Sequence, residues 1–81
     1  MIYTKMINKA LNIAYKAHHG QKDKGNVPYI FHPYHIAEKF NNETDICVAI
    51  LHDVLEDTFV SKEELEGYFP KEVIEPLVLL T

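Results

Sequence analysis

The sequence predicts an all-α protein of about five helices, and three observations carry that prediction. Apolar residues recur at spacings of three and four in several segments, which is the period of an amphipathic helix. Residues that typically cap or end helices separate these segments. No stretch alternates apolar and polar residues in the manner of a strand. With 81 residues, of which 47% are hydrophobic and 25% charged, the chain is expected to form one small ordered domain over residues 1–81.

The first helix is expected to begin after Thr4, an N-cap residue, and to run to about His19. Its apolar stripe is formed by residues at helical spacing: Met6, Ala10, Ile13, Ala14 and Ala17, widened by Ile7 and Leu11. Gly20 follows at the position where a glycine commonly ends a helix. His18 and His19 lie in the predicted last turn, where backbone carbonyls lack helical partners. We therefore expect both side chains to bond to these carbonyls rather than to a metal.

A polar loop is predicted from Gln21 to Tyr29, because lysine, aspartate, glycine, asparagine and proline dominate it. Phe31-His32-Pro33 then opens a second helix, since proline is tolerated at the first helical position. This arrangement places His32 at or next to the N-cap, where its side chain is free to project into a cleft. The second helix is expected to fade at Asn41-Asn42.

A third helix is expected to be capped by Thr44 or Asp45 and to lie at the centre of the fold. It is apolar on nearly every side, which is typical of a buried helix. Cys47, the only cysteine, lies in this apolar stretch, so we interpret it as a buried small hydrophobe rather than a nucleophile. A single free thiol excludes an internal disulfide and fits a reducing cytoplasm.

Two further helices are predicted in the last third of the chain. Ser61 and Glu64 form a capping box for a fourth helix that runs to about Tyr68. Pro70 opens a fifth segment, in which Pro76 should introduce a kink or end its first part. The apolar run Leu77 to Leu80 closes this segment, and we expect either missing sequence or a second copy of the chain in a homo-oligomer to cover it.

The composition excludes two classes of partner. The formal net charge of −4 argues against nucleic-acid binding, which requires a basic face. No apolar run approaches the roughly 20 residues of a membrane span. A small anionic ligand remains compatible with the charge, because a bound divalent cation reverses the local sign.

Four polar residues gather at the end of the apolar third helix: His52, Asp53, Glu56 and Asp57. Residues four apart share a face of a helix, so the cluster forms two pairs one turn apart. With His32 as an outside ligand, His52 and Asp53 suit manganese or iron, and zinc as an alternative. Carboxylates one turn away could accept a proton from water whose pKa a divalent cation lowers. The competing interpretation is a hydrogen-bonded polar plug between helices.

Ordered blocks of residues resemble the hydrolase half of RelA/SpoT-type proteins over nearly the whole chain. The blocks are Ala17-His18-His19-Gly20-Gln21, Pro28-Tyr29-Ile30-Phe31-His32-Pro33, Leu51-His52-Asp53-Val54-Leu55-Glu56-Asp57-Thr58, and Tyr68-Phe69-Pro70-Lys71-Glu72-Val73 with the closing Leu80-Thr81. That family consists of all-helical, manganese-dependent hydrolases of the HD superfamily. They remove the 3′-pyrophosphate from (p)ppGpp, the alarmone of the stringent response, and release GDP or GTP and pyrophosphate.

The resemblance implies an HD-domain-like bundle and assigns roles by position. The implied metal ligands are His32, His52 and Asp53, with Mn²⁺ as the metal and Fe²⁺ or Zn²⁺ as alternatives. Glu56 and Asp57 are implied as the pair that positions and activates the attacking water. An arginine–lysine pair holds the guanine nucleotide in the family, and Asp23 and Lys24 stand at the matching positions here, so only Lys24 carries over as a substrate-binding residue.

The resemblance also implies that residues 1–81 are the N-terminal part of an HD domain, truncated at its C-terminus. The family's fourth metal ligand is an aspartate much further along the chain, so we expect weak metal binding and little activity from these residues. Two other functions stay open. One is an HD phosphohydrolase that acts on another nucleotide or phosphoester, because Asp23 replaces the arginine. The other is an inactive helical module that interacts through its C-terminal apolar run.

Overall fold

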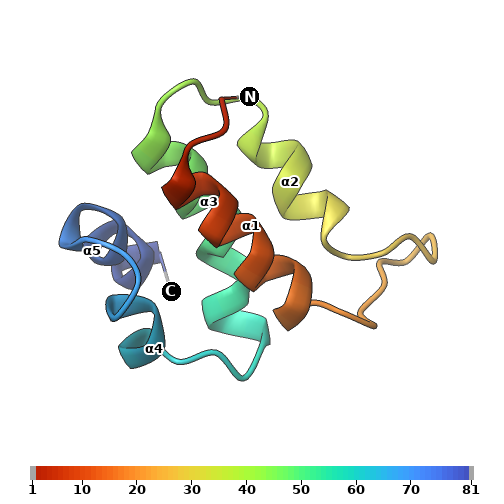
Figure 1. Ribbon diagram of the computed structural model, residues 1–81. Helices are drawn as coiled ribbons and strands as arrows, with labels where there is room; N and C mark the ends of the chain where they lie inside the picture. The colour runs from red at the N-terminus through yellow and green to blue at the C-terminus, as the bar shows by residue number, and fades with distance from the viewer. Residues whose placement is uncertain (1, 81) are drawn as a thin grey trace.

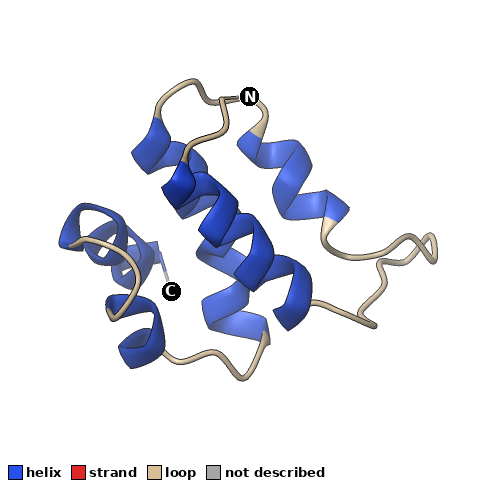
Figure 2. Ribbon diagram, in the orientation of Figure 1, coloured by secondary structure: helices blue, strands red, loops and turns tan. Residues whose placement is uncertain are grey.

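The computed structural model describes residues 2–80 and confirms the all-α prediction. The described residues form five helices, and their only strand-like feature is an isolated antiparallel bridge between Lys22 and Pro28 (Figures 1 and 2). In this part of the chain no helix is long and apolar enough to cross a membrane. Thr81, the last residue of the quoted motifs, lies outside the described residues.

Helix α1 spans Lys5–Ala17 and begins as predicted. The Thr4 hydroxyl oxygen accepts a hydrogen bond from the Ile7 N–H at 3.1 Å, so it caps the first turn. The helix ends about two residues before the predicted His19, because His18 already has C-cap geometry. Gly20 follows with a φ of +88°, a left-handed conformation that glycine adopts without steric cost.

Helix α2 spans Phe31–Ala37 and is shorter than predicted. The backbone after Ala37 forms hydrogen bonds between residues three apart, as in a 3₁₀ turn. The N–H of Lys39 donates to the carbonyl of Ile36, and the N–H of Phe40 donates to that of Ala37. Such bonds tighten and end the last turn, so the helix does not reach Asn41-Asn42. Its N-terminus also differs from the prediction, because the helix begins two residues before Pro33.

Helix α3 spans Glu43–Asp57 and is the central helix of the fold, as predicted. It packs against α1, α2 and α5, and Figure 1 shows α1 across it with α2 and α5 on opposite sides. Its fully buried residues are Ile46, Cys47, Ile50, Leu51 and Val54. The predicted cap was wrong: Asn42, rather than Thr44 or Asp45, accepts from the Asp45 N–H at 2.9 Å. Thr44 and Asp45 instead lie inside the first turn.

Helices α4 (Lys62–Glu66) and α5 (Lys71–Leu80) form a corner that packs on α3 through α5. Ser61 caps α4 by accepting from the Glu64 N–H at 3.1 Å, as predicted, although the helix ends before Tyr68. Pro76 does not end α5, which continues through it. Buried residues flank the proline on both sides, and their packing holds the helix together despite the missing N–H.

The C-terminal apolar run is only partly covered by the rest of the chain. Leu77 is fully buried in the core, whereas Leu79 and Leu80 are 87% and 57% exposed. Any further segment or second copy that covers this run would therefore contact Leu79 and Leu80 in the last turn of α5, because Leu77 is already covered by the core.

Candidate metal centre

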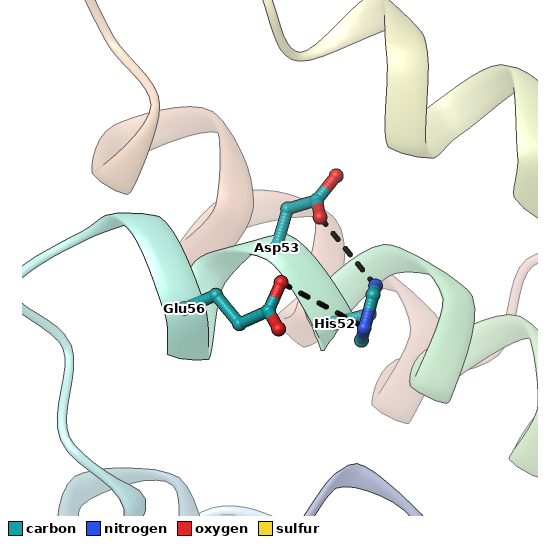
Figure 3. Close-up of side chains that lie close together, drawn as sticks. All are labelled: His52, Asp53 and Glu56. Carbon is teal, nitrogen blue, oxygen red and sulfur yellow. Dashed lines mark ion pairs between the residues drawn. The ribbon is translucent and has the colours of Figure 1, made fainter. Parts of the chain in front are cut away.

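The last two turns of α3 bring three potential metal ligands together. Figure 3 shows two carboxylates facing the His52 ring: its Nδ1 is 3.4 Å from Asp53 Oδ1, and its Nε2 is 3.9 Å from Glu56 Oε2. One ligand atom from each of the three residues lies within 4.8 Å of the other two. One imidazole and two carboxylates form a donor set that manganese, iron and zinc accept, so these residues fit a divalent cation.

His32 approaches this group from α2. Its Nε2 lies 3.8 Å from Asp53 Oδ2, the carboxylate oxygen that does not face His52. The packing of α2 on α3 thus brings the predicted outside ligand beside Asp53, across 20 intervening positions of sequence. His32 is not a member of the three-residue group, and its side chain is 54% exposed.

Glu56 and Asp57 have different surroundings, although the sequence places them next to each other. Glu56 lies beside the His52 ring. Asp57 is exposed, and its backbone carbonyl accepts a hydrogen bond from Gln21 Nε2 at 3.2 Å. The structure therefore brings Glu56, but not the Asp57 carboxylate, into the three-residue group.

Sequence reasoning missed Tyr29, whose hydroxyl donates to Asp53 Oδ2 at 2.9 Å. Burial raises the pKa of Tyr29 to about 12, helped by this hydrogen bond and by the negative charges of Asp53, Asp57 and Glu56. The phenol therefore keeps its proton and acts as a donor. Tyr29 belongs to one of the motif blocks, but nothing in its spacing indicates a bond to a helix 24 residues away.

His18 also has a partner that the sequence did not indicate. It is buried, its Nδ1 lies 2.8 Å from Gln21 Oε1, and its ring packs against Tyr29 with centroids 4.9 Å apart. The expected bond to a helix-end carbonyl was therefore wrong, because the side chain of Gln21 takes that place. His18 lies outside the three-residue group.

A cleft of about 420 Å³ opens beside the site, between α2, α3 and the end of α5. Its polar lining includes His32, His52 and Asp53, and its apolar lining includes Ile36, Phe40 and Leu80. Lys24 does not line this cleft, so the structure does not bring the predicted substrate-binding lysine to the metal group.

The loop that carries Lys24 is organised by Asp23. Its Oδ1 accepts hydrogen bonds from the N–H groups of Gly25 at 2.8 Å and Val27 at 3.0 Å. Asn26 adopts a φ of +67° at the tip, a conformation that asparagine tolerates better than most residues. The Asp23 carboxylate is therefore engaged with its own loop.

Known proteins are similar to this chain in sequence and in fold. The chain is 43% identical over 74 residues to the guanosine-3′,5′-bis(diphosphate) 3′-pyrophosphohydrolase of Borreliella burgdorferi, covering 86% of this chain and 11% of that protein. It is 39% identical over 72 residues to a GTP pyrophosphokinase of Myxococcus xanthus, covering 84% of this chain and 10% of that protein. A solved structure, described as a metazoan ortholog of SpoT that hydrolyses ppGpp and plays a role in starvation responses, matches with a TM-score of 0.83 at 27% identity. That match covers 100% of this chain and 50% of the other. The chain belongs to the RelA/SpoT family.

No protein-family model matches the chain. The match to the SpoT ortholog confirms the HD-domain-like helical bundle, because it extends over every residue. This RelA/SpoT chain spans about a tenth of the length of the curated relatives it matches. Those relatives include proteins named for hydrolysis of ppGpp and proteins named as pyrophosphokinases.

Proposed function

We propose that this RelA/SpoT chain forms the N-terminal part of a metal-dependent HD hydrolase that removes the 3′-pyrophosphate from (p)ppGpp in the cytoplasm. The observation that carries the proposal is the convergence of His52, Asp53 and Glu56 at the end of α3. It is supported by relatives named as ppGpp 3′-pyrophosphohydrolases. A polar plug between helices fits less well, because Glu56 is exposed and the group borders an open cleft.

In this proposal His52, Asp53 and His32 hold a divalent cation, with Mn²⁺ as the first candidate and Fe²⁺ or Zn²⁺ as alternatives. When bound, such a cation supplies positive charge that polarises a phosphoryl oxygen and favours loss of a proton from water. His52 and Asp53 approach this role from one helix, and His32 approaches Asp53 from another. Because two elements contribute ligands, the site depends on the packing of α2 against α3.

The proposed catalytic residues are Glu56 and Asp57, and the proposed substrate-binding residue is Lys24. Glu56 is accessible to solvent beside His52, so its carboxylate can hold a water molecule and take its proton. The water oxygen bonds to phosphorus while the bond from that phosphorus to the ribose 3′ oxygen breaks. The 3′ oxygen leaves with the bonding electrons and takes up the proton that Glu56 removed from the water, which gives GDP or GTP and pyrophosphate. Asp57 adds negative charge beside Tyr29, and Lys24 lies on an exposed loop outside the cleft.

The test measures Mn²⁺ binding and pyrophosphate release from ppGpp. Two chains are compared: residues 1–81, and the same residues joined to the half of the SpoT ortholog that this chain does not cover. We expect the longer chain to hydrolyse ppGpp until a chelator is added, and the shorter chain to show little activity. His52→Ala should abolish hydrolysis, whereas His35→Ala, on the exposed side of α2, should not. No release by either chain would contradict the substrate, and no Mn²⁺ binding would contradict the metal site.

A second candidate function is hydrolysis of another nucleotide or phosphoester, and Asp23 favours it. Its carboxylate stabilises the loop where the family has an arginine that holds the guanine nucleotide. A panel of nucleotides assayed with the longer chain separates the two candidates. If the second candidate is right, Asp23→Arg should raise ppGpp turnover despite the loss of two loop hydrogen bonds. A faster reaction with another nucleotide would favour the second candidate.

A third candidate is a helical interaction module that forms a homo-oligomer through the end of α5. The exposure of Leu79 and Leu80 favours it. This function predicts an oligomer in sedimentation experiments whose melting temperature is the same with and without a chelator. It also predicts that His52→Ala leaves both measurements unchanged. A melting temperature that depends on Mn²⁺ would count against it.

A further inference from the structure

We infer that Tyr29 is a positioning residue for the metal site: its hydroxyl holds Oδ2 of the Asp53 carboxylate, and this fixes the carboxylate with Oδ1 presented towards His52. The inference rests on the proposed metal site and extends it to a residue outside the ligand set. It follows from the different partners of the two carboxylate oxygens.

The two oxygens of Asp53 are not equivalent. Oδ2 accepts the Tyr29 hydroxyl at 2.9 Å and lies 3.8 Å from His32 Nε2, whereas Oδ1 lies 3.4 Å from His52 Nδ1. The last torsion of an aspartate side chain has a broad energy minimum, so an unrestrained carboxylate rotates through a wide range. A hydrogen bond from a hydroxyl to a charged oxygen is among the stronger protein hydrogen bonds and restricts that rotation.

Tyr29 is itself held from both sides. Its ring packs against His18 at 4.9 Å and against His32 at 5.6 Å between centroids. His18 is buried and pairs with Gln21, and the Gln21 amide also donates to the Asp57 carbonyl at the end of α3. The hydroxyl is therefore positioned by a packed ring and not by a mobile side chain. The same contacts join the polar loop to the helix that carries the site.

This arrangement has a consequence for cation binding. With Oδ2 engaged by Tyr29, Oδ1 is the oxygen left on the side of His52. A cation then meets a carboxylate that is already oriented, and less freedom is lost when it binds. Removal of a residue that orients a metal ligand typically lowers metal affinity by about 10- to 100-fold.

The test compares Tyr29→Phe with Tyr34→Phe. Each substitution removes one hydrogen-bonded hydroxyl and keeps the ring, but the Tyr34 hydroxyl bonds to that of Tyr3, outside the site. Calorimetric titration of residues 1–81 with Mn²⁺ should show about 10- to 100-fold weaker binding for Tyr29→Phe and unchanged binding for Tyr34→Phe. Equal affinity of Tyr29→Phe and the unsubstituted chain would overturn the inference.

A second readout needs no metal, so it separates this inference from the proposed function. In the metal-free chain, Tyr29→Phe should shift the carboxyl carbon resonance of Asp53, and Tyr34→Phe should leave it in place. If the unsubstituted chain binds no Mn²⁺, the proposed metal site is wrong, and this resonance alone decides whether Tyr29 orients Asp53. If Tyr29→Phe does not fold, the unsubstituted chain should still show a slowly exchanging Tyr29 hydroxyl proton, and its absence would overturn the inference.

Discussion

Cys47 lies on the part of α3 that has no contact with solvent. Its side chain is fully buried in the core. Burial, with a smaller contribution from the charge of Glu43, raises the pKa of the thiol from 9.0 to about 11. The residue therefore behaves as the small hydrophobe that its apolar neighbours predicted, and its thiol stays protonated at neutral pH.

This raised pKa predicts a loss of stability in alkaline solution. The folded state keeps the thiol proton up to about pH 11, whereas the unfolded state releases it near pH 9. The contribution of Cys47 is thus complete below pH 9 and is lost as the pH rises through 11, at about 1.4 kcal/mol for each unit. Urea denaturation from pH 8 to 11 should show this fall in the free energy of unfolding. In Cys47→Ala the fall should be shallower, and an unchanged slope would contradict the assignment.

At the scale of single elements, the N-cap of α3 determines where the site-bearing helix begins. Asn42 accepts from the Asp45 N–H, and its side-chain amide also donates to the Asp45 carboxylate at 2.7 Å. Asn42→Ala should lower the free energy of unfolding by about 1 kcal/mol, measured by urea denaturation. Asn42→Ser should retain most of it. Asn41→Ala, one residue earlier, serves as the control, and an equal loss there would argue against a specific cap.

Pro76 is a locally unfavourable residue inside α5. Alanine is favoured over proline in a helix interior by about 3 kcal/mol, and proline recovers up to about 1 kcal/mol by restricting the unfolded chain. Pro76→Ala should therefore raise the free energy of unfolding by about 2 kcal/mol. The neighbouring Glu75→Ala, at an exposed position, should change it by less than about 0.5 kcal/mol. A loss of stability in Pro76→Ala would show that the proline ring contributes packing that an alanine cannot replace.

Local sequence patterns predicted which segments form helices better than they predicted the residues at which those helices begin and end. Thr4 and Ser61 were identified as caps because a capping side chain bonds to a backbone group three residues away, within the same short segment. Asn42 was missed because Thr44 and Asp45 are also good caps, and sequence alone does not rank them. Sequence alone also left open whether Pro76 kinks α5 or ends its first part. The outcome depends on packing against α3, which involves residues distant in the sequence.

The same distinction applies to the candidate site. Helical spacing predicted that His52 and Glu56 share a face, and the structure places them together. His32 and Asp53 lie close together only because α2 packs on α3. The family resemblance implied this proximity, whereas the spacing of the residues in the sequence did not. The Tyr29 bond to Asp53 had no local signal, because the hydroxyl reaches across the fold from the end of a loop.

At the scale of the whole molecule, cation binding should be linked to folding. His32 and His52 lie on different helices, so a cation that they share binds the folded chain better than the unfolded one. Free Mn²⁺ at a hundred times its dissociation constant should raise the free energy of unfolding by about 2.7 kcal/mol. Thermal melting with increasing Mn²⁺ measures this effect. His52→Ala should remove it and His35→Ala should not, whereas an equal shift in both variants would indicate nonspecific binding.

The carboxylates at the C-terminal end of α3 lower the stability of the helix as well as forming part of the candidate site. Helix α3 has acidic residues in its last turn, at the negative end of the helix dipole, and no basic residue there to offset them. Each such charge destabilises a helix by roughly 0.3–1 kcal/mol. Under the proposed function these charges lower the stability of the helix end, and a cation bound beside Glu56 would offset part of that cost.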